Sequence, residues 1–233
     1  MRRGLWVVAL LTATACAPKN RDAIEKMKPE YATLRARLAK IGQAIPGTPL
    51  PASLAKLQLS PSPAFGSSDA NTDLLSFEQL ADVYAKPRLD LHAEGDLVRG
   101  LGWTGDHSPA ADSMLERRDG KALEAQLRQA LQYRYLVVYR TVGLIEPVVV
   151  DEHTFKAGQV VMVLYLVDLA NGDKISALAG AAGQTAPATE YMYKKGEDPK
   201  ERLAAFAHST LYESVLKEIR EKLALTTGGQ YKF

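Results

Sequence analysis

The chain has 233 residues, of which 46% are hydrophobic and 24% charged, a composition typical of a globular protein with one ordinary domain and additional segments. Its formal net charge is +2, but removal of residues 1–15 would take away Arg2 and Arg3 and leave 27 of the 29 basic residues against 27 acidic ones. A neutral chain lacks the strongly basic surface that binding to phosphates requires, so we expect no nucleic-acid partner.

The N-terminus has the order of a secretory signal. Arg2 and Arg3 are followed by an uncharged apolar run over residues 5–11 and then by the small residues 12–15, directly before Cys16. The apolar run is about half of the ~20 residues that a membrane-spanning helix needs. We therefore expect a cleaved signal peptide over residues 1–15 and no permanent transmembrane anchor.

Residues 1–16 resemble bacterial lipoprotein signal peptides, and this resemblance implies that Cys16 is acylated and becomes the first residue of the mature chain. Cys16 is also the only cysteine of the chain, which an oxidising compartment would disfavour without such a use. The usual lipobox has Leu where this chain has Ala13. Residues 13–15 also suit ordinary signal peptidase, which would release a soluble periplasmic protein, and a chance hydrophobic N-terminus is the third alternative.

Ala17 follows the cysteine, where an Asp would resemble a signal for retention in the inner membrane. The resemblance therefore favours a lipid-anchored protein of the bacterial cell envelope, held on the outer membrane and facing the periplasm. Two or three acyl chains would anchor it stably, since each buried methylene contributes about 0.8 kcal/mol.

The mature chain divides into segments of different composition. Residues 16–45 predict a lipid-anchored helical arm, with Leu34, Leu38 and Ile41 at helical spacing and a start near Lys28, before Pro29. Residues 46–71, rich in Pro and Ser, predict a linker or a wrapped loop. An α+β domain over residues 72–228 and a tail over residues 229–233 complete the chain.

Helices and strands alternate through the predicted domain. A short helix is expected from Ser76, and residues 88–94 alternate apolar and polar side chains, as in a half-buried strand. Four apolar side chains near the next loop are expected to be buried: Leu97, Val98, Leu101 and Trp103. A helix should follow Asp119, with Leu123, Leu127, Ala130 and Leu131 on one stripe.

The second half of the domain predicts strands and one long helix. Residues 133–142 read as a strand, residues 148–155 as a bend, a bulged continuation or an edge strand, and residues 159–169 as a central strand. Asn171-Gly172 predicts a type I′ hairpin turn. The returning strand, residues 173–184, is rich in small residues that would let a helix approach closely.

The candidate for that helix begins at Asp198-Pro199, an N-cap followed by a proline at the first helical position. Its apolar side chains recur at every fourth position: Leu203, Ala207, Leu211, Val215, Ile219 and Leu223. Together these elements predict an α+β fold: a mainly antiparallel sheet, with the helices from 119 and 198 packed on one face.

One constellation has the residue types for chemistry. Asp90, His92, Glu94 and Asp96 fall at every second position, so a regular strand would place all four on one face, where they could bind a divalent metal or act as acid and base. Their side chains would lie ~7 Å apart along the strand, too far for a compact site without another segment. The solvent-exposed face of an amphipathic strand is the competing interpretation.

Other candidates are weaker. His107 beside Asp106 is expected in an exposed loop, and His153 and His208 are expected in surface or packing roles. Tyr133, Tyr135 and Tyr139 predict an aromatic stripe, a binding platform or ordinary packing. The sequence contains neither a Gly-x-Ser-x-Gly elbow nor a phosphate-binding loop. We therefore expect no enzyme, no cofactor and no metal site.

The stretch from Val163 to Ile175, VLYLVDLANGDKI, resembles the hairpin of envelope lipoproteins in the curli-assembly and penicillin-binding-protein-activator group. The resemblance covers barely a dozen residues, implies a sheet-and-helix accessory domain, and transfers no functional residues. The leading hypothesis is a non-enzymatic envelope lipoprotein that acts as a scaffold, adaptor or regulator of a protein partner. The alternatives are a binder of a small ligand or lipid, in a cavity between the sheet and the long helix, and a hydrolase that uses the acidic face around His92.

Overall fold

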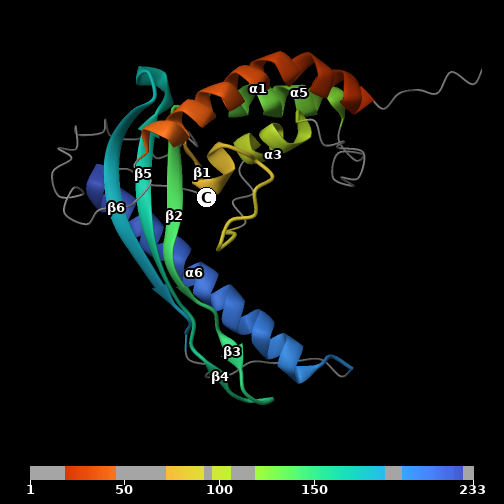
Figure 1. The fold of residues 1–233 in the computed structure, drawn as a ribbon. Coiled ribbons are helices and arrows are strands. Elements are labelled where there is room, and N and C mark those ends of the chain that lie inside the picture. The colour runs from red at the N-terminus through yellow and green to blue at the C-terminus, as the bar shows by residue number, and fades with distance from the viewer. Residues whose placement is uncertain (1–18, 46–71, 92–95, 106–118, 187–195, 228–233) are drawn as a thin grey trace, which may run out of the picture.

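The computed structural model of the chain describes residues 19–45, 72–91, 96–105, 119–186 and 196–227 (Figure 1). In these ranges the elements are, in chain order, α1 (Lys19–Ala44), β1 (Thr72–Ser76), η1 (Glu78–Leu80), α3 (Asp96–Trp103), α5 (Gly120–Ala130), β2 (Tyr135–Ile145), β3 (Val148–Val149), β4 (Phe155–Lys156), β5 (Gln159–Asp168), η3 (Leu169–Asn171), β6 (Lys174–Gln184) and α6 (Pro199–Thr227). The predicted α+β class is confirmed. Among the helices of these ranges, none combines enough length and hydrophobicity to cross a membrane.

The main sheet has four strands in the order β1-β2-β5-β6. Strands β2, β5 and β6 form an antiparallel meander, whereas the short β1 pairs parallel to β2, with Thr72 opposite Tyr135. A β-bulge between Thr141 and Gly143 interrupts the register of β2. Strands β3 and β4 form a separate two-stranded ribbon beyond this bulge, one that the alternatives considered for residues 148–155 did not include.

The sheet separates two hydrophobic clusters, because β2 and β5 carry apolar side chains on both faces. On one face, Leu136 and Val138 of β2 pack with residues of α1, α3 and α5. On the other, Val137 and Tyr139 pack with α6. The expectation that the helices from 119 and 198 share one face is therefore corrected: α5 and α6 lie on opposite faces.

Helix α1 belongs to the body of the protein and is not a separate arm. Met27 and Tyr31 are fully buried, and the Tyr31 hydroxyl donates a hydrogen bond to the carbonyl of Leu127 in α5 at 3.1 Å. The helix begins at Lys19, so Pro29 lies within it and not at its start. Proline inside a helix costs about 3 kcal/mol. The burial of Ile24 and Met27, worth about 1.5–3 kcal/mol for each side chain, holds the preceding turns in place.

Helix α6 is confirmed where the sequence places it. Asp198 accepts a hydrogen bond from the backbone N–H of Lys200 at 2.8 Å, and all six side chains of the predicted stripe are at most 1% exposed. The close approach to small residues is also confirmed, because a Cβ on Gly183 of β6 would lie 2.2 Å from Cγ2 of Val215. The interface between α6 and the sheet is tightly packed at this point, which leaves no room there for the ligand cavity considered from sequence.

The hairpin between β5 and β6 forms, but its turn differs from the predicted type I′ turn. The positive φ angles fall at Gly172 (72°) and Asp173 (62°), one residue later than expected. The cause is the carboxylate of Asp168, which accepts hydrogen bonds from the backbone N–H groups of Ala170 and Asn171 and winds them into η3.

Candidate functional site

The residues predicted to carry chemistry fall only partly in the described ranges. Outside these ranges lie Cys16, the histidines His92 and His107, and the acidic residues Glu94 and Asp106. Asp90 is described, and it does not lie on a strand. Residues 88–91 form no ladder, and the chain resumes as α3 at Asp96, so Asp90 and Asp96 share no strand face. The strand predicted over residues 88–94 is therefore corrected for residues 88–91, and residues 92–94 lie outside the described ranges.

The backbone groups on either side of Asp90 are hydrogen-bonded by a tyrosine side chain and not by a neighbouring strand. The Tyr139 hydroxyl donates a hydrogen bond to the carbonyl of Leu89 at 3.2 Å and accepts one from the N–H of Leu91 at 3.4 Å. Leu89 and Leu91 are buried, which explains the alternating pattern. Burial raises the pKa of the Tyr139 phenol above its ordinary value, and the negative charge of Asp90 adds to this. Tyr139 is therefore a neutral structural donor.

The other predicted candidates have local, structural roles. His153 lies exposed in the turn after β3, where Asp151 accepts a hydrogen bond from its backbone N–H, and Nδ1 of His208 lies 3.6 Å from a carboxylate oxygen of Glu146. Tyr135 and Tyr139 are buried against α6, so their stripe packs the core and offers no platform. Tyr133 packs instead against the cluster on the opposite face. In the part of the chain that the structure describes, no three His, Cys, Asp or Glu side chains are grouped to hold a metal ion.

A different feature stands out, an uncovered part of the sheet. Helices α1, α3 and α5 lie together beside β1, near one end of the long strands, whereas α6 runs diagonally along the sheet (Figure 1). Directly opposite residues of an antiparallel pair point to the same face. Val163 packs with the α1-side cluster, and its neighbour at the second position along β5, Val161, points the same way but is 48% exposed. The α1-side helices therefore cover only one half of this face.

The uncovered half extends across three strands. Val161 lies opposite Gly143 of β2 and Ala182 of β6, and Gln159, two residues away, lies opposite Ile145 and Gln184. Ile145 is 61% exposed, and Val142, the extra residue of the bulge, is also exposed. We call this surface the open sheet face and define it by its exposed or half-exposed members: Val142, Gly143, Ile145, Val161, Gly180 and Ala182.

An arginine side chain lies at the border between the covered and uncovered halves of this face. Arg140 lies opposite Val163, and its guanidinium stacks 3.9 Å from the centroid of the Phe77 ring. Burial raises the pKa of the neighbouring Tyr165 phenol, although the positive charge of Arg140 opposes the shift. The open sheet face thus borders one half-buried arginine at its inner end and the exposed Gln159 and Gln184 at its outer end, with aliphatic side chains and glycines between them.

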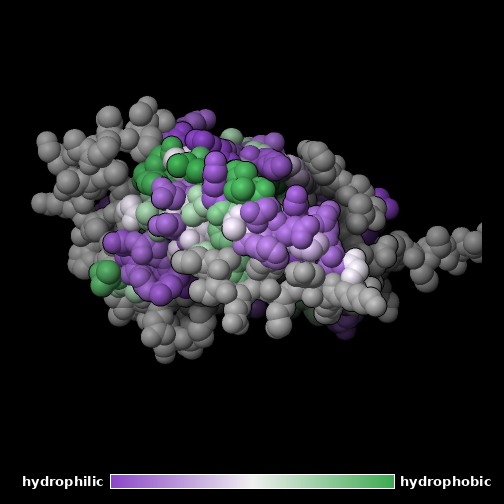
Figure 2. All heavy atoms as spheres, turned by 90° about the horizontal axis from the view of Figure 1, so that it is seen from below, coloured by the Kyte–Doolittle hydropathy of each residue, from purple (hydrophilic) through white to green (hydrophobic). Residues whose placement is uncertain are grey.

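The outer end of the open sheet face continues toward the β3–β4 ribbon. A hollow of about 640 Å³ lies there, lined by His153, Thr154, Phe155, Ala157, Gln184, Thr185 and Ala186. Val148 and Val150, on the ribbon, are more than half exposed. Figure 2, seen from the end where β3 and β4 lie, shows hydrophobic residues gathered beside hydrophilic ones. Apolar surface at this end of the molecule is therefore not confined to one side chain.

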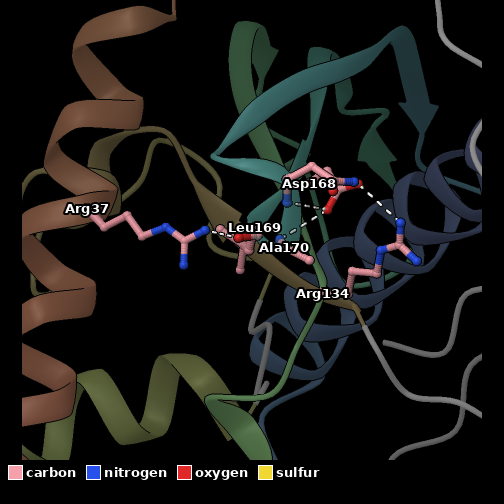
Figure 3. A network of polar contacts seen from close by, with 6 residues as sticks. Arg37, Arg134, Asp168, Leu169 and Ala170 are labelled. Carbon is pink, nitrogen blue, oxygen red and sulfur yellow. Dashed lines mark hydrogen bonds and ion pairs between the residues drawn. The ribbon is translucent and has the colours of Figure 1, made fainter.

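A second hollow, of about 450 Å³, contains two arginines, Arg37 of α1 and Arg134 before β2. They lie on opposite sides of the turn at η3 (Figure 3). Arg37 donates hydrogen bonds to the carboxylate of Asp173 and to the carbonyl of Leu169, and Arg134 lies 3.5 Å from a carboxylate oxygen of Asp168. Both guanidinium charges thus have a carboxylate partner within the fold. This network fixes the η3 turn against α1.

The open sheet face presents aliphatic side chains on a rigid sheet, and sequence reasoning missed it because Val142, Ile145 and Val161 read as ordinary strand residues. The available signal was Gly143 and Pro147, which mark the bulge and the end of β2. Searches for related proteins match this chain to no protein-family model and to no curated protein.

Proposed function

We propose that this chain is a lipid-anchored accessory protein of the bacterial cell envelope, which binds a protein partner through the open sheet face. The observation that carries the proposal is the exposure of Ile145, Val161 and Ala182 on three adjacent strands, beside the exposed Val142. Contiguous apolar surface on a rigid element is costly to leave in water and marks binding sites in soluble proteins.

The sequence supports the envelope part of the proposal. The segment before Cys16 resembles a lipoprotein signal, and Cys16 is the single cysteine of the chain. Acylation there would tether α1, which begins at Lys19, within a few residues of the membrane surface. Because α1 packs into the body, the tether would hold the whole domain near the membrane, with less reach than a separate helical arm would give.

Crosslinking in the cells that make this protein tests the binding surface. A photo-crosslinking amino acid at Val161 is expected to give one discrete protein adduct, and Ile145→Lys in the same chain should abolish that adduct because a charge would enter the apolar contact. The control position is Leu225 of α6, which is 82% exposed but lies outside the open sheet face. Equal labelling from Val161 and Leu225, or an adduct that Ile145→Lys leaves unchanged, would overturn the proposed surface.

The mass of the native protein tests the anchor independently. We expect the chain to start at Cys16 and to carry acyl chains, and Cys16→Ala to abolish both the acylation and the membrane association. A native protein that retains residues 1–15, or that lacks acyl chains, would contradict the anchor without affecting the crosslinking result.

A further inference from the structure

Strand β6 forms one edge of the main sheet. It pairs with β5 on one side, and none of the residues that the structure describes pairs as a strand with its other side. An edge strand presents a row of backbone N–H and C=O groups that can pair with another strand. What can occupy this edge depends on the direction of those groups and on the side chains between them.

Two hydrogen bonds fix the direction of the backbone groups. The N–H of Thr185 donates to the carbonyl of Gly158 at 3.1 Å, which points it toward β5. The N–H of Gln184 points away from β5 and donates to the hydroxyl of Ser214 in α6 at 3.2 Å. Since the direction alternates along a strand, the backbone groups of Gly180 and Ala182 also point outward. Their side-chain positions are exposed on the open sheet face.

Native edge strands are normally protected by a charge, a proline or a bulge in the middle of the edge. Between Lys174 and Gln184 the sequence of β6 is Ile-Ser-Ala-Leu-Ala-Gly-Ala-Ala-Gly, without charge and without proline. A bulge does occur, opposite Leu166 and Val167, but it lies near the start of the strand. The stretch from residue 178 to residue 182 therefore combines regular register, outward backbone groups and uncharged residues, four of which are Ala or Gly.

We infer that β6 pairs antiparallel with β6 of a second copy of this chain, centred on Gly180. The bulge limits the regular stretch at one end and the Ser214 hydrogen bond limits it at the other, so Gly180 lies at its middle. In this register, Gly180 faces Gly180 of the second copy and residue 178 faces residue 182. No two like charges meet, so the edge is complementary to itself, as a two-fold contact requires.

The pairing also extends the open sheet face. The two-fold axis of an antiparallel edge contact is perpendicular to the sheet, so both copies present their α6 helices on one side and their open sheet faces on the other. Val161, which lies opposite Ala182, would then belong to one apolar surface shared by two copies. The inference concerns self-association and holds whether or not an envelope partner binds there.

The mass of the purified full-length chain in detergent gives the first test. We expect the mass of two chains, and an increase of about tenfold or more in the dissociation constant for Ala182→Lys, which adds a charge to the edge, and for Ala182→Pro, which removes an outward N–H. Ala125→Lys, at an exposed position of α5, is the matched control and should leave the dissociation constant unchanged. The lysine variant adds an exposed side chain and needs no change in the β5–β6 ladder, so it stays informative if the proline variant unfolds.

A thiol at the two-fold axis gives the second test. Since Cys16 is the only native cysteine, Cys16→Ser combined with Gly180→Cys leaves one thiol, which would face its own copy across the edge. The nearest atom to a Cβ at Gly180 is 4.0 Å away, so the substitution fits. Mild oxidation should link this variant into dimers faster than Cys16→Ser with Ala125→Cys. A mass of one chain, or equal crosslinking of the two thiols, would overturn the inference.

Discussion

Replacement of Gly183 by alanine tests the close contact between β6 and α6. The new Cβ would lie 2.2 Å from Cγ2 of Val215, 3.0 Å from its backbone N and 3.1 Å from its Cα. Rotation of the valine relieves the first contact, but the other two involve the backbone of α6, so the helix itself must move by a few tenths of an ångström. Overpacking of this kind costs about 1–3 kcal/mol, a large part of a typical stability of about 5–15 kcal/mol.

The matched control is Gly180→Ala, the same substitution three residues earlier on the same strand. There the nearest atom to the new Cβ is the carbonyl oxygen of Met162 at 4.0 Å, and removal of a glycine from a compatible position stabilises by about 0.4–1 kcal/mol. Urea unfolding should thus separate the two variants by more than about 1 kcal/mol. For a chain of this size, the Gly183→Ala variant should melt about 3–10 °C lower than the wild type.

A second substitution identifies the atoms responsible. Val215→Ala removes the methyl that lies nearest the new Cβ and leaves the backbone contacts. The double variant should therefore be less destabilised than the sum of the two single variants, by about 0.5–2 kcal/mol. Equal stability of the Gly183→Ala and Gly180→Ala variants would refute the assignment of one covered and one open face of β6.

Two further predictions follow from single side chains. Tyr139→Phe removes the hydrogen-bond partner of the Leu89 carbonyl and of the Leu91 N–H, which should lower the free energy of unfolding by about 1–3 kcal/mol at neutral pH. Because burial raises the pKa of Tyr139, the unfolded chain loses the phenolic proton at a lower pH than the folded protein. The wild type therefore loses stability as the pH rises above about 10, and its stability advantage over the Phe variant should shrink. A constant difference in the free energy of urea unfolding between about pH 8 and 11 would contradict this. Pro29→Ala restores a helical N–H on the exposed face of α1 and should stabilise the protein by about 1–3 kcal/mol. A variant that melts at a lower temperature than the wild type would contradict this and show that α1 accommodates the proline without cost.

Much of the secondary structure could be predicted from sequence because the pattern was local. The fourfold spacing in α6, the run of apolar residues in β5 and the small residues of β6 each depend on the period of one element. The misassigned segments are those in which a distant group decides. Residues 88–91 alternate like a strand but are held by the hydroxyl of Tyr139, and the strand β1, only five residues long, forms because β2 offers it a parallel edge.

The amino-acid sequence by itself determined the α+β class, the long helix after Asp198 and the contact of that helix with the small residues of β6. It also determined the features before Cys16 from which an envelope anchor is proposed. Only the tertiary structure decided that α5 and α6 lie on opposite faces, that α1 joins the core, and that one half of the α1-side face is left open. The reason is physical: the period of a strand or helix states which side chains share a face, but the packing of distant segments decides what, if anything, covers that face.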